Sequence, residues 1–131
     1  MAWEAPGQIV TFPCVTTGLA RYRFVNISTA GNVIYTVAAG ESIGVIQDGT
    51  TGSTVDPTCA SVMISGISKV AVSTASTIGV GQTVAASSRG SAVVAIAASY
   101  AVGKVVAGTS GGANRVVSVL LSPAGHSTAL V

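Results

Sequence analysis

The sequence predicts an all-β (mainly β) protein whose single domain is a small sandwich or barrel. The first observation is composition: the 131 residues include 16 glycines, 16 serines and 14 threonines, and only 8% are charged, against about 25% in an ordinary soluble domain. Long surface helices are rich in Glu, Lys and Arg, so this composition disfavours them. The second observation is that short apolar runs recur at roughly 8–12-residue spacing with glycine turns between them, which is typical of sandwiches and barrels. A chain of this length is one domain by default and buries enough surface for a core.

Short apolar runs bounded by turn residues predict the strands after residue 30. The Asp48-Gly49 dipeptide is a strong turn signal, and the glycine-rich residues 108–114 are expected to connect the last two strands. The pattern of residues 93–99 does not distinguish a strand from a helix, because an Ala-rich apolar run is compatible with both. The expected strands are residues 33–38, 43–47, 61–65, 69–73, 83–86, 103–107 and 115–121.

The first 30 residues differ from the rest of the chain. They hold four of the six aromatic residues and two of the four prolines, Pro6 and Pro13. Proline cannot donate to a strand ladder, which limits how this segment can join a central sheet. One interpretation is therefore an extended N-terminal arm over residues 1–30, with residues 31–123 folding without it and residues 124–131 as a C-terminal tail. The alternative is an ordinary first hairpin of the core.

Candidate interface residues lie in the same N-terminal segment. Aromatic and arginine side chains are enriched at interfaces and dominate their binding energy. In an arm, the aromatic side chains would anchor a neighbouring subunit or shell, and Arg21 and Arg23 would pair with carboxylates of the partner. The alternative is that the aromatic side chains plug one end of the protein's own barrel. The candidates are Trp3, Phe12, Arg21, Tyr22, Arg23 and Phe24.

No catalytic, cofactor or metal site is expected from the sequence, so we expect a protein that is not an enzyme. The single histidine, His126, lies in the expected tail, where a solvated side chain is expected rather than a member of a catalytic triad. One histidine, two cysteines and four carboxylates, spread along the chain, do not form a ligand-spaced group. Residues 49–53 lack the lysine of a phosphate loop, and residues 79–84 have Val84 where a dinucleotide fingerprint has its third glycine. Both stretches are better interpreted as turns.

Charge, hydropathy and cysteine content restrict the expected partners. The net charge is +2 and the six basic residues are scattered, so direct binding of nucleic acid is not expected. The uncharged residues 90–103 number 14, fewer than the roughly 20 of a membrane-spanning helix, and neither a membrane partner nor a signal peptide is expected. A surface so poor in charge promotes association with other protein. Cys14 and Cys59 are expected to be two buried free thiols, with a disulfide as the alternative.

Five stretches carry a resemblance to a known family. They are AGESIGV at residues 39–45, GISKV at 66–70, IGVGQTV at 78–84, VGKVVAG at 102–108 and NRVVSVLL at 114–121. In this order and spacing, the chain from about residue 37 to 123 resembles the small capsid decoration (cement) proteins of tailed bacteriophages.

That resemblance implies a fold and a role. The family has a compact β-tulip or barrel-like domain, binds the major capsid protein lattice on the outside of the capsid, and commonly forms homotrimers. It supplies no catalytic residues and no cofactor. The expected location is therefore the virion exterior, after synthesis in the host cytoplasm. A phage tail-tube or head-tail structural protein is the alternative, and a host-surface or carbohydrate-binding β-module is a third reading.

Overall fold

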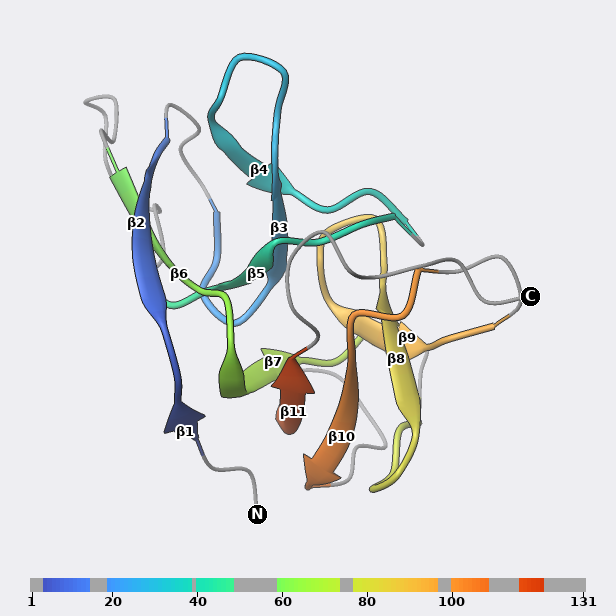
Figure 1. Cartoon of the computed structure of the whole chain (residues 1–131). Helices are drawn as coiled ribbons and strands as arrows, with labels where there is room; N and C mark the ends of the chain where they lie inside the picture. The colour runs from blue at the N-terminus through green and yellow to red at the C-terminus, as the bar shows by residue number, and fades with distance from the viewer. Residues whose placement is uncertain are drawn as a thin grey trace.

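The chain is all-β over the residues that the computed structural model describes, which are 4–14, 19–38, 40–48, 59–73, 77–96, 100–108 and 116–121. These residues form eleven strands and no helix, arranged in two antiparallel sheets (Figure 1). The predicted fold class is therefore confirmed. No helix in this part of the chain is long and apolar enough to cross a membrane.

The two sheets, here called sheet A and sheet B, each combine pairs of consecutive strands with strands from distant parts of the sequence. Sheet A, in the lower and right part of Figure 1, has the order β1 (Ala5–Pro6), β7 (Gly66–Ala71), β11 (Val116–Leu121), β10 (Gly103–Ala107), β8 (Thr83–Ala86) and β9 (Ala92–Val94). Sheet B, in the upper left, has the order β2 (Ile9–Pro13), β6 (Cys59–Met63), β5 (Gly44–Ile46), β3 (Phe24–Ile27) and β4 (Val33–Tyr35).

A two-stranded ribbon passes from one sheet to the other and joins them. β1 pairs with β7 in sheet A, while β2 pairs with β6 in sheet B, and both pairs are continuous along the chain. At the corner, the Gly7 amide donates to the Ser65 carbonyl over 3.2 Å and the Ile64 amide donates to the Gln8 carbonyl over 2.9 Å. Gly66 has a φ of +95°, and a Cβ atom there would collide with the backbone of Gly7. Two backbones approach so closely at this corner that only glycine fits.

The main hydrophobic core lies between the two sheets. Phe24, Val45 and Met63 contribute from sheet B, and strands β7, β8, β10 and β11 contribute mostly valines from sheet A. Phe24 faces Val45 across the β3–β5 pair, and Val45 faces Met63 across the β5–β6 pair, so these three side chains share one face of sheet B. Alternating side chains point to opposite faces of a strand, so their neighbours in sequence point away from this core.

A second core covers the opposite face of sheet B. Val25, Ile46 and Val62 point to this face and are fully buried. Cys14 and Leu19, which lie between β2 and β3 in the sequence, pack against them, with Phe12 and Tyr35 at the margin. Sheet B is therefore buried on both faces, and the segment that follows β2 supplies part of its cover.

The expectation that residues 1–30 form an arm outside the domain is wrong for the residues described. β1 and β2 are the edge strands of sheets A and B, and β3 lies inside sheet B. Phe24 is 0% exposed, in the core between the sheets. Pro6 and Pro13 lie on edge strands, where a missing donor leaves one side of the ladder intact. The prolines exclude a central position, as argued from the sequence, but they do not exclude the edges.

The predicted strands differ from the observed ones mainly at the corner between the sheets. Residues 83–86 and 103–107 match β8 and β10, and residues 92–94 of the ambiguous run form the strand β9. Residues 66–68, expected as a connection, are the first half of β7, because the ribbon bends ahead of them at Ile64 and Ser65. Trp3, the expected loop at 50–57 and the tail at 124–131 lie outside the described residues.

The two cysteines have different environments. They do not form a disulfide with each other; Cys14 is buried as expected, but Cys59 is exposed. Cys59 begins β6 opposite Pro13, at the outer end of an edge pair, so no sheet covers it.

Candidate functional site

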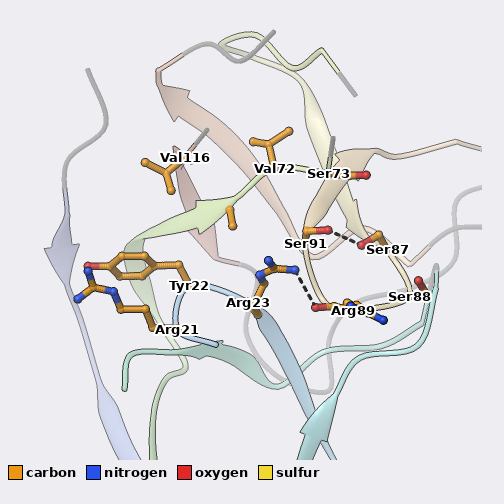
Figure 2. Close-up of a pocket in the computed structure, with 11 residues that line it drawn as sticks. Arg21, Tyr22, Arg23, Val72, Ser73, Ser87, Ser88, Arg89, Ser91 and Val116 are labelled. Carbon is orange, nitrogen blue, oxygen red and sulfur yellow. Dashed lines mark hydrogen bonds between the residues drawn. The ribbon is translucent and has the colours of Figure 1, made fainter. Parts of the chain in front are cut away.

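One open hollow of about 610 Å³ combines three arginines with a cluster of serines (Figure 2). It lies where the chain entering β3 meets the end of β7 and the turn between β8 and β9. We call it the arginine hollow. It is lined by Arg21, Tyr22, Arg23, Ala71, Val72, Ser73, Ser87, Ser88, Arg89, Ser91 and Val116.

The β8–β9 turn holds the serine side of the hollow in place. The Gly90 amide donates to the Ser87 carbonyl over 3.0 Å, and the Ser87 amide donates to the Ser91 carbonyl over 2.7 Å. Gly90 has a φ of +73°, as expected for the left-handed residue that closes a three-residue hairpin loop. The side-chain hydroxyls of Ser87 and Ser91 are hydrogen-bonded to each other. Arg89 therefore projects from a turn that is fixed by its own hydrogen bonds.

The same turn is bound to sheet B. The Phe24 amide donates to the Gly90 carbonyl over 2.7 Å. A Cβ atom at Gly90 would collide with the Phe24 carbonyl oxygen, so the approach depends on glycine. The turn of sheet A and the start of β3 are consequently one rigid unit around the hollow.

Tyr22 bridges the two sheets through its backbone. Its amide donates to the Ile46 carbonyl in sheet B, and its carbonyl accepts from the Ala71 amide in sheet A, both over 2.8 Å. Tyr22 has a φ of +63°, a left-handed conformation that is uncommon for a residue other than glycine. Hydrogen bonds on both sides hold it there, and they set the direction of the arginines at positions 21 and 23.

The charged side chains of the hollow are all positive. Three arginines line it, and none of the described residues that line it is Asp or Glu. The Arg21 guanidinium lies 4.9 Å from the centre of the Tyr22 ring, within the range of a cation–π contact. Arg23 Nη1 donates to the Arg89 carbonyl over 3.4 Å, and Arg23 Nε is buried without a hydrogen-bond partner. The arrangement offers N–H and hydroxyl donors to an anionic group.

The structure brings together three of the six interface candidates and separates the others. Arg21, Tyr22 and Arg23 line the arginine hollow, Phe24 is fully buried between the sheets, and Phe12 packs against the second core. Sequence reasoning missed Arg89 and the serines around it. The only sequence signal was a polar Ser-Ser-Arg-Gly turn between two apolar runs, which does not reveal that the turn meets Arg23.

The described residues hold no group of three or more His, Cys, Asp or Glu side chains arranged for a metal ion. The sole histidine lies outside them. The chemistry that the hollow presents is therefore donation of hydrogen bonds and positive charge.

Comparison with solved structures identifies a similar fold. The chain is similar to the N base of the head fiber protein gp8.5 of bacteriophage phi29, with a TM-score of 0.63 and 16% sequence identity. The similarity covers 88% of this chain and 95% of that chain. No protein-family model and no curated protein sequence matches. At this identity the likeness shows the fold alone.

Proposed function

We propose that this protein is a structural component of a bacteriophage head. The observation that carries the proposal is the similarity in fold to the base of a phage head fiber, over 88% of the chain. The composition supports the same class of function. A chain with 8% charged residues has a surface poor in charge, which favours association with other protein.

Within that class, the proposed role is decoration of the capsid exterior. The protein binds the lattice of the major capsid protein, and three copies associate around three-fold or quasi-three-fold positions. The resemblance of the motifs in residues 39–121 to capsid decoration proteins supports this assignment over a tail-tube or head-tail role. Closed rotational symmetry is also the usual arrangement when identical chains assemble on a symmetric shell.

Co-sedimentation with capsids tests the proposal. The purified full chain is mixed with expanded empty capsids of the phage that encodes it, and the pellet is analysed for stoichiometry and by cryo-electron microscopy. We expect saturable binding and density on the outer surface, with copies in contact around three-fold positions. A chain that stays in the supernatant and assembles into rings or tubes by itself supports the tail-tube alternative and contradicts a head role. Isolated, non-contacting copies on the capsid would contradict the trimer.

A further inference from the structure

The arginine hollow contains a positive charge that no carboxylate among its described lining residues neutralises. Arg23 is partly buried, its Nε atom has no hydrogen-bond partner, and the hydrogen bond that its Nη1 atom donates to the Arg89 carbonyl is long at 3.4 Å. A desolvated cation is costly unless it is paired. The partial removal of water from Arg23 therefore costs free energy unless a negatively charged group binds to its guanidinium.

The three guanidinium groups form a row along the hollow. Figure 2 shows Arg23 in the middle, Arg21 and Tyr22 on one side, and Arg89 on the other. Cations gathered in one hollow repel one another where, as among the described lining residues, no carboxylate lies between them, and an anion placed among them is attracted by all three. The row fits an extended ligand that carries more than one negative group better than it fits a single small ion.

The apolar part of the lining indicates a protein ligand. Tyr22, Val72 and Val116 lie beside the arginines, and tyrosine with arginine is the combination that is enriched at the energetic centres of protein interfaces. A polyphosphate chain is tracked by a continuous basic surface, whereas this protein has a net charge of +2 and only six basic residues in all. Carboxylates on a protein segment match the hollow, because arginine binds a carboxylate through two parallel hydrogen bonds.

We propose that the arginine hollow binds an acidic segment of the major capsid protein, with one carboxylate on Arg23 and flanking carboxylates on Arg21 and Arg89. This inference rests on the proposed function for the identity of the partner, and it assigns the contact surface. The serine hydroxyls of the β8–β9 turn supply further donors at the Arg89 end. Binding then pairs the partly buried Arg23 with a carboxylate. Because Arg21 and Arg89 are exposed, their share of the attachment to the capsid weakens with salt.

Capsid co-sedimentation with matched variants tests the contact. The variants are Arg21→Ala, Arg89→Ala and the double variant; the control is Lys104→Ala, which removes one exposed positive charge from β10 outside the hollow. Arg21 and Arg89 are exposed, so the variants keep the fold, which thermal unfolding verifies. We expect each single variant to weaken binding about tenfold, the double variant more, and Lys104→Ala to leave it within about twofold. Arg23→Lys keeps the positive charge but loses the planar guanidinium that binds a carboxylate through two hydrogen bonds. It should weaken binding about tenfold as well.

The outcomes separate this inference from the proposed function. If the wild-type chain does not bind capsids, the proposed role fails and the assigned partner fails with it. If the wild-type chain binds and the double variant binds equally well, the role stands and the arginine hollow is not the contact. Equal weakening by Lys104→Ala would show an effect of net charge alone and would also overturn the inference.

A competition experiment checks the chemistry of the ligand. Hexaglutamate peptide and inorganic phosphate are added to the wild-type chain on capsids at matched ionic strength. We expect hexaglutamate to displace the wild-type chain and phosphate to have no effect beyond that of sodium chloride. Displacement by phosphate at the same concentration as the peptide, or no displacement by hexaglutamate, would overturn the assignment of a carboxylate ligand.

Discussion

Sheets A and B are made from similar small apolar residues, but they are buried differently. All three residues of β5 in sheet B are buried, since one face of that sheet packs on sheet A and the other packs on the second core. In sheet A, Lys104 on β10 and Leu120 on β11 face each other across the pair and are exposed, whereas Val105 and Val119 are buried. The outer face of sheet A is therefore open to solvent at this pair, whereas its inner face is covered.

The difference in burial between the two sheets shows what the N-terminal third of the chain contributes to the hydrophobic cores. A sheet that is buried on both faces needs an additional cover, and here Cys14 and Leu19 supply part of it. β3 adds Phe24 to the core between the sheets and Val25 to the second core. The segment that differs most in composition from the rest of the chain is thus the one that joins the two cores.

Deletion of residues 1–30 is the largest change that this comparison suggests. It removes β1, β2 and β3, together with Leu19 and Phe24 from the two cores. We expect loss of cooperative unfolding, because sheet B loses three of its strand pairings and its cover. Circular dichroism and a thermal melt measure this. A truncated chain that melts cooperatively near the wild-type temperature would restore the interpretation of residues 1–30 as an arm.

Phe24→Ala tests the core between the sheets. The side chain is 0% exposed, and truncation of a buried phenylalanine lowers the free energy of unfolding by about 3–5 kcal/mol. Phe12→Ala is the matched control, since Phe12 is half-buried on the edge strand β2; we expect a smaller loss, about 1–2 kcal/mol. Urea denaturation measures both. A larger loss at Phe12 than at Phe24 would place the more important core on the other face of sheet B.

A pair of substitutions compares the two sheets directly. Ile46→Ala in β5 removes a side chain that is 0% exposed and should cost about 2–5 kcal/mol. Leu120→Ala in β11 changes a side chain that is 48% exposed and should cost less than about 1 kcal/mol. Equal losses in urea denaturation would mean that the outer face of sheet A is covered in solution, for example by another copy of the chain.

Gly90→Ala tests the junction of the β8–β9 turn with sheet B. The substitution combines left-handed strain with a collision against the Phe24 carbonyl, and it should cost about 2–3 kcal/mol. Gly81→Ala is the control, because Gly81 also has a positive φ, +90°, but open space around its Cβ position; strain alone should cost about 1–2 kcal/mol. Thermal unfolding of both variants measures the difference. Identical losses would show that the close approach of the turn to β3 is not rigid.

The sequence by itself determined the fold class and most strands, because glycine turns and short apolar runs act locally. It also indicated Arg21, Tyr22 and Arg23 as candidate interface residues, since their type is typical of interfaces and their position is contiguous. Only the tertiary structure decided that Phe24 belongs to a core, because its partners Val45 and Met63 lie far along the chain. The same holds for Arg89, whose turn reaches Arg23 through the hydrogen bond between Phe24 and Gly90. Contacts of this kind join residues that are not linked by any helical or strand periodicity in the sequence. They therefore become visible only when the two sheets are packed together.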